Sequence, residues 1–334
     1  MRERKVLSQN GSRQIPEDNK DNIFVRFGTQ LEPMQGLSLE DYAEQYNLIA
    51  FDQGDAELTA SQLILSGGKM ETVQLYFNTS GKQYAPSMIA FPNGKAVLVS
   101  EENLGNRKNK VYANFKYSPR DLRIKARYVE NDPYTNRELM GHCFAAALSC
   151  LFACNPNLRQ NMKKPTIVMV GRPASQEWER CEVEYAQILG QYTGEYLPGC
   201  KIAIVAIGES CAAMAGALGM ENWFRKVAQI LDLGSSTFDS FTITPKGVPK
   251  NAADSYQFGG RDLDRAIEFY ADHCFSKKFP PEKGYSFGTP YGKTAALRFK
   301  KEQCYGTLGK SEYASHYEYK VYQKKNGKPI CRNI

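Results

Sequence analysis

The sequence predicts an α/β protein built of two similar lobes. Apolar runs of strand length alternate along the chain with Ala- and Leu-rich stretches of helical period. One local pattern also occurs twice. An apolar run ends at Asp52-x-Gly54, another ends at Asp232-x-Gly234, and a second apolar run follows each. Two strand–turn–strand units in equivalent contexts indicate two related lobes, which would bring their turns to opposite sides of one cleft.

The composition fits a soluble globular protein and disfavours several classes of partner. The 334 residues suffice for two domains or one large two-lobed unit, and 42% are hydrophobic and 24% charged. The net charge of +7 comes from scattered Lys and Arg residues without the aromatic interleaving of a nucleic-acid groove. No stretch approaches the length of a membrane span. We therefore expect a cytoplasmic protein without a nucleic-acid or membrane partner.

Cysteine usage predicts buried thiols in a reducing compartment. None of the nine cysteines forms a C-x-x-C pair, and Cys143, Cys150 and Cys154 fall at helical spacing in an apolar run. The three histidines lack the spacing of metal ligands, so we expect no zinc site.

The first lobe is predicted to span residues 47–224, behind an N-terminal extension of residues 1–46. In the extension, residues 1–22 are polar and indicate a flexible lead-in, and Ser38-x-x-Asp41 predicts the start of a helix that runs to about Gln45. Strands are expected at 23–27, on both sides of the Asp52 turn within 48–65, at 73–77 after a Gly-Gly turn, and at 88–91 and 96–99 around a Pro-Asn-Gly hairpin. Residues 107–117 are expected to form a basic, aromatic connector.

The rest of the first lobe alternates helices with apolar strands, and residues 225–334 are predicted to be part of a second lobe. Helices are expected at 136–154, 175–189 and 209–218, and strands at 166–170 and 201–207. After the second strand–turn–strand unit, Gly259-Gly260 leads into a helix at 261–273.

The turn that follows Asp232 has the chemistry of a phosphate-binding loop. The small residue Gly234 lets the backbone turn sharply and leaves its N–H groups free to face an anion. The hydroxyls of Ser235, Ser236 and Thr237 add hydrogen-bond donors. Asp232 and Asp239 bracket the turn with carboxylates, the ligand type that holds hydrated Mg²⁺. The pattern indicates a metal–nucleotide site, and its alternative is an ordinary Gly/Ser hairpin.

Five segments in one order resemble the nucleotide-binding domain of the heat-shock protein 70 family, within the actin-like ATPase superfamily. The resemblance covers roughly residues 47–310 and is specific as a set. The segments are the first phosphate loop at 51–54, the Tyr-Ala-Pro-Ser-Met-Ile-Ala-Phe strand at 84–91, the connecting helix at 207–215, the second phosphate loop at 232–239 and the Gly-Gly segment at 258–264.

The resemblance implies an actin-like ATPase fold, in which two ribonuclease H-like lobes enclose a nucleotide cleft. It also implies ATP and Mg²⁺ as cofactors. Asp52 and Asp232 would orient Mg²⁺ through its water shell. The nucleotide would be held by Gly54 and Asp55, by Gly234, Ser235 and Ser236, by Gly259 and Gly260, and by Glu302 on the adenosine side.

The catalytic residues implied by the resemblance are Lys116, Glu209, Asp232, Thr237 and Asp239. Lys116 matches the family's catalytic lysine, which would stabilise charge on the transferred phosphoryl group. Thr237 would lie near the γ-phosphate, Glu209 would contact metal-bound or attacking water, and Asp239 would help to orient it. Other readings remain open, because Lys116 can be a surface lysine, Glu209 a favourable charge at a helix N-terminus and Gly259-Gly260 a simple turn.

The chain departs from the family pattern at several positions. Asp55 and Ala56 stand where the family has a Thr pair, Ser235 and Ser236 replace glycines, and Ser210 replaces a proline. Tyr305 and Gly306 replace the adenine-side lysine and arginine. Nothing after residue 308 resembles the family's adenosine motif, so the second lobe is expected to be incomplete.

Several functions remain open at this point. The first is the ATP-binding, ATP-hydrolysing domain of a divergent Hsp70-like chaperone, with ATP and ADP as ligands and with protein clients or co-chaperones as further partners. The second is a catalytically degenerate nucleotide-binding or interaction module, which the altered first loop favours. The third is an actin-like filament protein, because Gly260-Arg-Asp-Leu resembles the actin version of that loop. A sugar kinase is less well supported, since no acceptor-activating Asp context is found.

Overall fold

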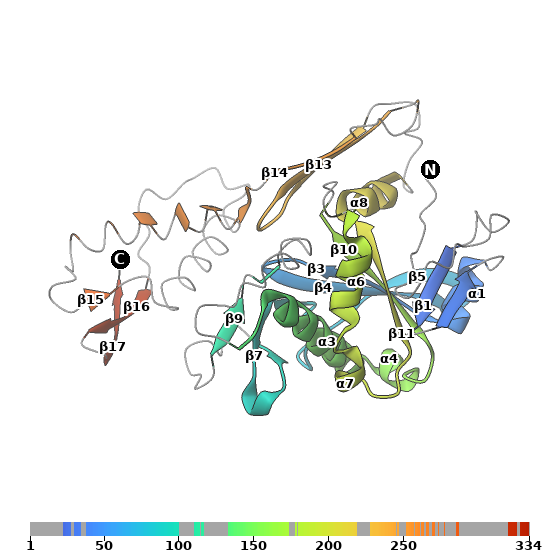
Figure 1. Cartoon of the computed structure of the whole chain (residues 1–334), viewed down its shortest axis with the longest axis horizontal. Helices are drawn as coiled ribbons and strands as arrows, with labels where there is room; N and C mark the ends of the chain where they lie inside the picture. The colour runs from blue at the N-terminus through green and yellow to red at the C-terminus, as the bar shows by residue number, and fades with distance from the viewer. Residues whose placement is uncertain are drawn as a thin grey trace. The chain divides into compact units, whose positions relative to one another are not determined.

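A computed structural model of the whole chain shows the arrangement of the main elements (Figure 1). It describes residues 23–27, 30–34, 38–99, 110–113, 115–116, 133–173, 178, 180–218, 228–244, 246, 252–256, 258–260, 262–263, 265–266, 269–270, 273, 277, 285–286, 320–325 and 328–333. Glu302, the 1–22 lead-in and the adenine-side residues at 305 and 306 lie outside these ranges, so the expectations made for them stay predictions.

A six-stranded mixed sheet forms the centre of the first part of the chain (Figure 1). Its main path runs in the order β11 (Ile202–Gly208), β10 (Thr166–Arg172), β3 (Asn47–Gln53), β4 (Glu57–Ser66) and β5 (Lys69–Gln74), and β6 (Tyr84–Pro86) pairs with β4. The first three strands are parallel, whereas β4 and β5 continue the sheet antiparallel. The carboxyl ends of β3, β10 and β11 therefore meet at one edge of the sheet.

The sheet is covered on both faces, as its strand patterns require. On β3, Ile49 and Phe51 belong to the main core, whereas Leu48 belongs to a smaller cluster on the other side. Successive strand side chains point to opposite faces, so this alternation places β3 between two packed layers. A sheet buried on both faces needs the nearly continuous apolar runs that the sequence has here.

Helices supply the two covering layers. The main core contains residues of α3 (Asn136–Cys154), α4 (Pro156–Gln160), α6 (Glu182–Gly190) and α7 (Thr193–Tyr196). The other face is covered by α1 (Leu39–Gln45), whose Ala43 packs in the smaller cluster. Capping boxes start two of these helices, with Ser38 and Asp41 at α1 and Thr135 and Glu138 at α3.

Smaller sheets and one further helix complete the described structure. A three-stranded sheet has β7 (Met88–Ala90) between β8 (Val97–Leu98) and β9 (Val111–Ala113), with a 3-10 turn, η2 (Pro92–Gly94), before β8. Helix α8 (Glu209–Leu218) follows β11 directly. The other described strands form three further sheets. The first pairs β1 (Ile23–Phe27) with β2 (Gln30–Met34), and the second contains β12 (Ala228–Leu233), β13 (Phe238–Ile243) and β14 (Ala253–Tyr256). The third contains β15 (Tyr285–Ser286), β16 (Lys320–Lys325) and β17 (Lys328–Asn333).

Most predicted elements are confirmed, and two differ from their prediction. The strand expected at 73–77 is β5 at 69–74, because Gly67 and Gly68 adopt positive φ angles of 57° and 77° and close a tight turn that lets the strand resume at once. The connector expected at 107–117 contains β9. The helix expected at 175–189 is confirmed from Glu182 as α6, and residues 175–177 of its expected start lie outside the described ranges.

The chain divides into two compact units. The first comprises residues 1–232 and 238–256, and the second comprises residues 233–237 and 257–334. The predicted lobe boundary at 224/225 stays a prediction. Within the described ranges, no helix is both long enough and apolar enough to cross a membrane.

Candidate functional site

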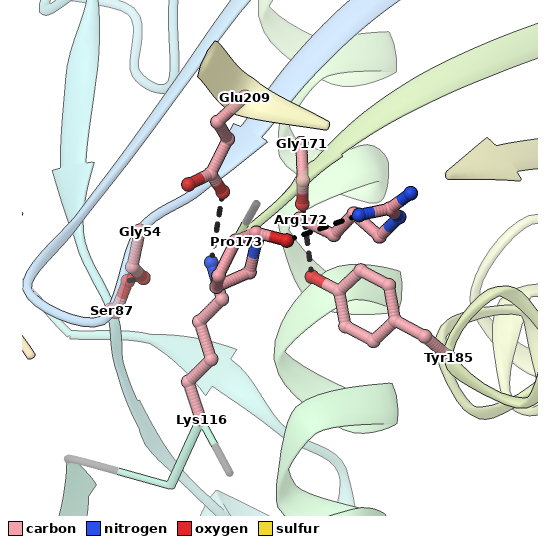
Figure 2. Close-up of polar contacts among 8 residues, drawn as sticks. All are labelled: Gly54, Ser87, Lys116, Gly171, Arg172, Pro173, Tyr185 and Glu209. Carbon is pink, nitrogen blue, oxygen red and sulfur yellow. Dashed lines mark hydrogen bonds and ion pairs between the residues drawn. The ribbon is translucent and has the colours of Figure 1, made fainter. Parts of the chain in front are cut away.

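A buried ion pair joins Lys116 to Glu209 in the first unit. The Lys116 Nζ donates to the Glu209 Oε1 at 3.2 Å, and the two side chains are 8% and 22% exposed (Figure 2). Burial alone would lower the pKa of Lys116, but the carboxylates of Glu209 and Asp52 raise it above its ordinary value. The lysine is therefore held as a cation, away from bulk water.

The sheet brings these side chains together. The β3–β10 and β10–β11 pairings align Phe51 with Val170 and Arg172 with Gly208. Asp52 follows Phe51 and Glu209 follows Gly208, so both carboxylates leave the sheet at its carboxyl edge. Such an edge is where ligands commonly bind in open α/β sheets. Lys116, which lies three residues after β9, comes from a different part of the chain.

The charges of this site influence one another strongly. Asp52 keeps solvent-accessible surface, but the protein atoms around its carboxyl raise its pKa to about 6, which Lys116 opposes and Glu209 and Asp232 reinforce. Burial, together with Glu209 and Asp239, also raises the pKa of Asp232. The carboxylates of Asp52, Glu209 and Asp232 therefore share the neighbourhood of one lysine, and Asp239 lies near Asp232. We call Asp52, Lys116, Glu209, Asp232 and Asp239 the charged cluster.

Two residues that the sequence reasoning missed support this cluster from below. A Cβ built on Gly171 would lie 2.7 Å from the Glu209 Cγ and 3.0 Å from its Oε1. The Glu209 side chain therefore rests on the bare backbone of Gly171 in β10. The hydroxyl of Tyr185, a fully buried α6 residue, donates to the Gly171 carbonyl at 3.4 Å (Figure 2). Neither residue belongs to a segment that marked the site in the sequence.

A second ion pair anchors the start of α6 to the same strand end. Both the Nε and an Nη of Arg172 donate to one oxygen of Glu182, at 3.1 Å and 3.0 Å, and another Nη donates to the Pro173 carbonyl. The Arg172 side chain is 4% exposed. The Arg172–Glu182 ion pair therefore holds the start of α6, and with it Tyr185, against the carboxyl end of β10.

The first predicted phosphate loop is a compact turn between β3 and β4. A Cβ on Gly54 would lie 2.5 Å from the Glu57 carbonyl oxygen, so the turn requires glycine at this position. The hydroxyl of Ser87 donates to the Gly54 carbonyl (Figure 2). Asp55, which was expected at the phosphates, has a buried side chain.

The second predicted phosphate loop is braced by the Gly-Gly segment. The Gly234 N–H donates to the Thr237 carbonyl at 2.9 Å, which closes the loop. The Gly260 N–H donates to the Gly234 carbonyl at 3.0 Å, and a Cβ on Gly259 would lie 2.6 Å from the Ser235 carbonyl oxygen. The two glycines therefore bring backbone against backbone, an arrangement that residues with side chains cannot adopt.

The described site residues fall into two groups. The charged cluster, Gly54 and Asp55 belong to the first unit, and Gly234, Ser235, Ser236, Thr237, Gly259 and Gly260 belong to the second. Ser235 and Ser236 are half-buried, whereas Thr237 is buried. The roles of all these residues in binding nucleotide stay predictions.

The chemistry of the charged cluster fits a hydrated divalent cation better than a directly bound one. Within the part of the chain that is described, no three His, Cys, Asp or Glu side chains are grouped closely enough to hold a metal ion themselves. However, burial raises the pKa of both Asp52 and Asp232, and neighbouring carboxylates raise it further, Glu209 at both residues and Asp239 at Asp232. A nearby hydrated Mg²⁺ would relieve this repulsion.

Comparison with known proteins identifies the fold. No protein-family model and no curated protein matches the chain. Among solved structures, it is similar to MreB 5 of Spiroplasma citri, crystallised with AMPPNP bound, with a TM-score of 0.50 and 16% sequence identity over 86% of this chain and 71% of that one. MreB is an actin-like ATPase, so the chain has an actin-like α/β fold, which confirms the predicted fold class.

Proposed function

We propose that this chain binds ATP with Mg²⁺ and hydrolyses it at the charged cluster. The observation that carries the proposal is the grouping of Asp52, Lys116, Glu209 and Asp232 at the carboxyl edge of the sheet. These residues come from four separate parts of the sequence. Burying a lysine among carboxylates costs desolvation free energy, and such buried charges are typical of functional sites. The likeness in fold to MreB 5, whose structure contains the nucleotide AMPPNP, supports the nucleotide as ligand.

The proposed chemistry needs no covalent intermediate. Phosphoryl transfer depends mainly on positioning and on stabilising charge. The Lys116 ammonium would stabilise the charge that develops on the transferred phosphoryl group, and Glu209 would accept a hydrogen bond from the attacking water. Backbone N–H groups of the loops after Asp52 and Asp232 would contact the phosphates. When bound, Mg²⁺ would neutralise phosphate charge, with Asp52 and Asp232 holding its water shell.

The finer proposal is that the chain is the nucleotide-binding part of a divergent Hsp70-like chaperone. Its support is the set of five ordered motifs between residues 51 and 264. Among the described residues, the half-exposed and buried thiols of Cys143, Cys150, Cys154, Cys181 and Cys200 form no disulfide, which suits the reducing, cytoplasmic setting that we propose.

Calorimetry tests the proposal directly. We expect the chain to bind ATP in the presence of Mg²⁺ and to lose that binding when EDTA removes the metal. The Asp232→Asn variant should bind at least about tenfold more weakly, since it removes one charge from the cation's surroundings. The matched control is Asp254→Asn, which removes an exposed carboxylate from β14. Equal binding by the wild type with and without Mg²⁺ would refute the metal role.

A second candidate is an actin-like filament protein. Two observations favour it, namely the fold shared with an actin-like ATPase and the likeness of residues 260–263 to the actin version of that loop. Sedimentation at increasing chain concentration decides between the two. Assembly that requires ATP would support a filament, whereas a monomer that hydrolyses ATP at all concentrations would support the first proposal.

A further inference from the structure

Tyr185 lies beside the charged cluster, and it belongs to none of the motifs that the sequence shows. Its side chain is completely buried, and it comes from α6, an element that contributes none of the predicted site residues. Figure 2 shows its hydroxyl directed toward the strand end that carries Gly171, on the inner side of the Lys116–Glu209 pair. A buried tyrosine beside a buried ion pair is a specific choice, because phenylalanine would fill the same space without a polar atom to satisfy.

A short chain of contacts links Tyr185 to the ion pair. The Tyr185 hydroxyl donates to the Gly171 carbonyl, and the Glu209 side chain rests against Gly171 on the side where a Cβ would be. Glu209 in turn accepts from Lys116. A displacement of the Gly171 backbone would therefore move the surface that supports Glu209.

The tyrosine ring itself is held in place. The Trp178 ring packs edge-to-face on it, with ring centroids 5.0 Å apart and an interplanar angle of 84°. The bracket from Arg172 to Glu182 fixes the same helix one turn earlier. The Tyr185 side chain is thus held rigidly against the carboxyl end of β10.

We propose that Tyr185 is a positioning residue, which holds the Gly171 backbone and thereby the Lys116–Glu209 pair in the geometry needed for phosphoryl transfer. This inference rests on the proposed function. Tyr185 does not touch the nucleotide in this role, so it affects the rate of hydrolysis and not the affinity for ATP. It also keeps Lys116 paired and shielded whether or not nucleotide is bound.

The test compares Tyr185→Phe with a matched variant, Tyr196→Phe. Tyr196 is also a buried tyrosine of the first unit, and its hydroxyl accepts from the Ala96 N–H at 2.8 Å, away from the charged cluster. Both variants lose one hydroxyl and keep the ring, and the Tyr196 hydroxyl also lies 3.2 Å from the His142 Nδ1, so the control removes at least as many polar contacts. We expect Tyr185→Phe to lower kcat about 3- to 10-fold, the range that one modest hydrogen bond controls, with KM for ATP changed less than about twofold. Tyr196→Phe should leave kcat and KM as in the wild type.

A second readout does not depend on hydrolysis. Acetylation of Lys116 by an N-hydroxysuccinimide ester, followed by mass spectrometry, reports how well the lysine is paired and shielded. We expect acetylation of Lys116 to be about threefold or more faster in Tyr185→Phe and unchanged in Tyr196→Phe.

The outcomes separate the two proposals. If the wild type does not hydrolyse ATP, the proposed function fails, and the acetylation rates alone decide the role of Tyr185. An acetylation rate in Tyr185→Phe equal to that of the wild type overturns the positioning role. A variant that loses affinity for ATP with unchanged kcat overturns it as well.

Discussion

Replacing Gly171 with alanine tests the geometry of the site by way of protein stability. Gly171 has no positive φ, so the backbone accepts alanine. Alanine also lowers the conformational entropy of the unfolded chain, and this effect alone would stabilise the fold by roughly 0.5–1 kcal/mol. The new Cβ, however, would lie 2.7 Å from the Glu209 Cγ. This atom is too near the backbone to swing aside without rotation of the whole side chain, which breaks the ion pair with Lys116.

The cost follows from the burial of the pair. Breaking a fully buried ion pair costs about 3–5 kcal/mol. Glu209 is 22% exposed and Lys116 keeps Asp52 nearby, so we expect about 2–3 kcal/mol here, less the alanine gain. Gly171→Ala should therefore destabilise the chain by about 1–2 kcal/mol. In a Glu209→Ala background the clash is absent, and the same change should be neutral or stabilising by up to about 1 kcal/mol.

The assay is a double-mutant cycle measured by urea unfolding at pH 7. Tryptophan fluorescence and far-UV circular dichroism are followed together, and a free energy is taken only where the two transitions coincide, since the chain has two compact units. The expected coupling between the two sites is about 2 kcal/mol. If Gly171→Ala costs the same in both backgrounds, the alanine clashes with something other than Glu209, and the reasoning about the support of the ion pair fails.

Three further predictions concern ligand binding and catalysis. The pKa of Asp52 is raised to about 6, so this carboxyl takes up a proton as the pH falls through about 6. Mg²⁺-dependent ATP binding, measured by calorimetry, should therefore weaken below that pH. Asp52→Asn should abolish this pH dependence, whereas Asp41→Asn, which removes a carboxyl with a lowered pKa, should retain it. Lys116→Ala should slow single-turnover hydrolysis by about 10²-fold or more while changing ATP affinity much less, and an equal loss of both would speak against a transition-state role. Gly259→Ala places a Cβ 2.6 Å from backbone atoms of the second loop. Those backbone atoms cannot swing aside, so the affinity for ATP should fall. The control variant Gly194→Ala, which has open space around the new Cβ, should bind ATP as the wild type does.

Local patterns in the sequence were enough to find most helices and strands. The long helix α3 was predicted with its observed bounds from its helical period and its Ala- and Leu-rich composition, and in the structure a capping box of Thr135 and Glu138 starts it. The strand after Gly67-Gly68 was placed too late, because a two-residue turn with both glycines at positive φ leaves no connecting residues. Turn chemistry, not strand propensity, decided that boundary.

The candidate site was harder to predict from sequence. Asp52 and Asp232 stood out because each closes an apolar run before a glycine, whereas Lys116 was found only through the family resemblance. Tyr185 gave no signal and Gly171 gave little, because their importance arises from contacts between β10, α6 and α8 that no local pattern reveals. A glycine inside an otherwise apolar strand was the one available hint, since such a residue often marks a close approach.

The two predicted phosphate loops differ in what supports them, and this difference suggests which one is more sensitive to substitution. In the first loop a side chain adds to the backbone contacts, because the Ser87 hydroxyl donates to the Gly54 carbonyl. In the second loop the closest contact joins backbone to backbone, where Gly259 meets Ser235 and the Gly260 N–H donates to Gly234. A side-chain support can be replaced by another side chain or by water, at a cost of about 0.5–1.5 kcal/mol for the lost hydrogen bond. A backbone contact that excludes a Cβ has no such substitute. Ser87→Ala should therefore reduce ATP affinity by no more than about tenfold, and Gly259→Ala by more than that, and calorimetry on the two variants would refute this ranking if Ser87→Ala proved the more damaging.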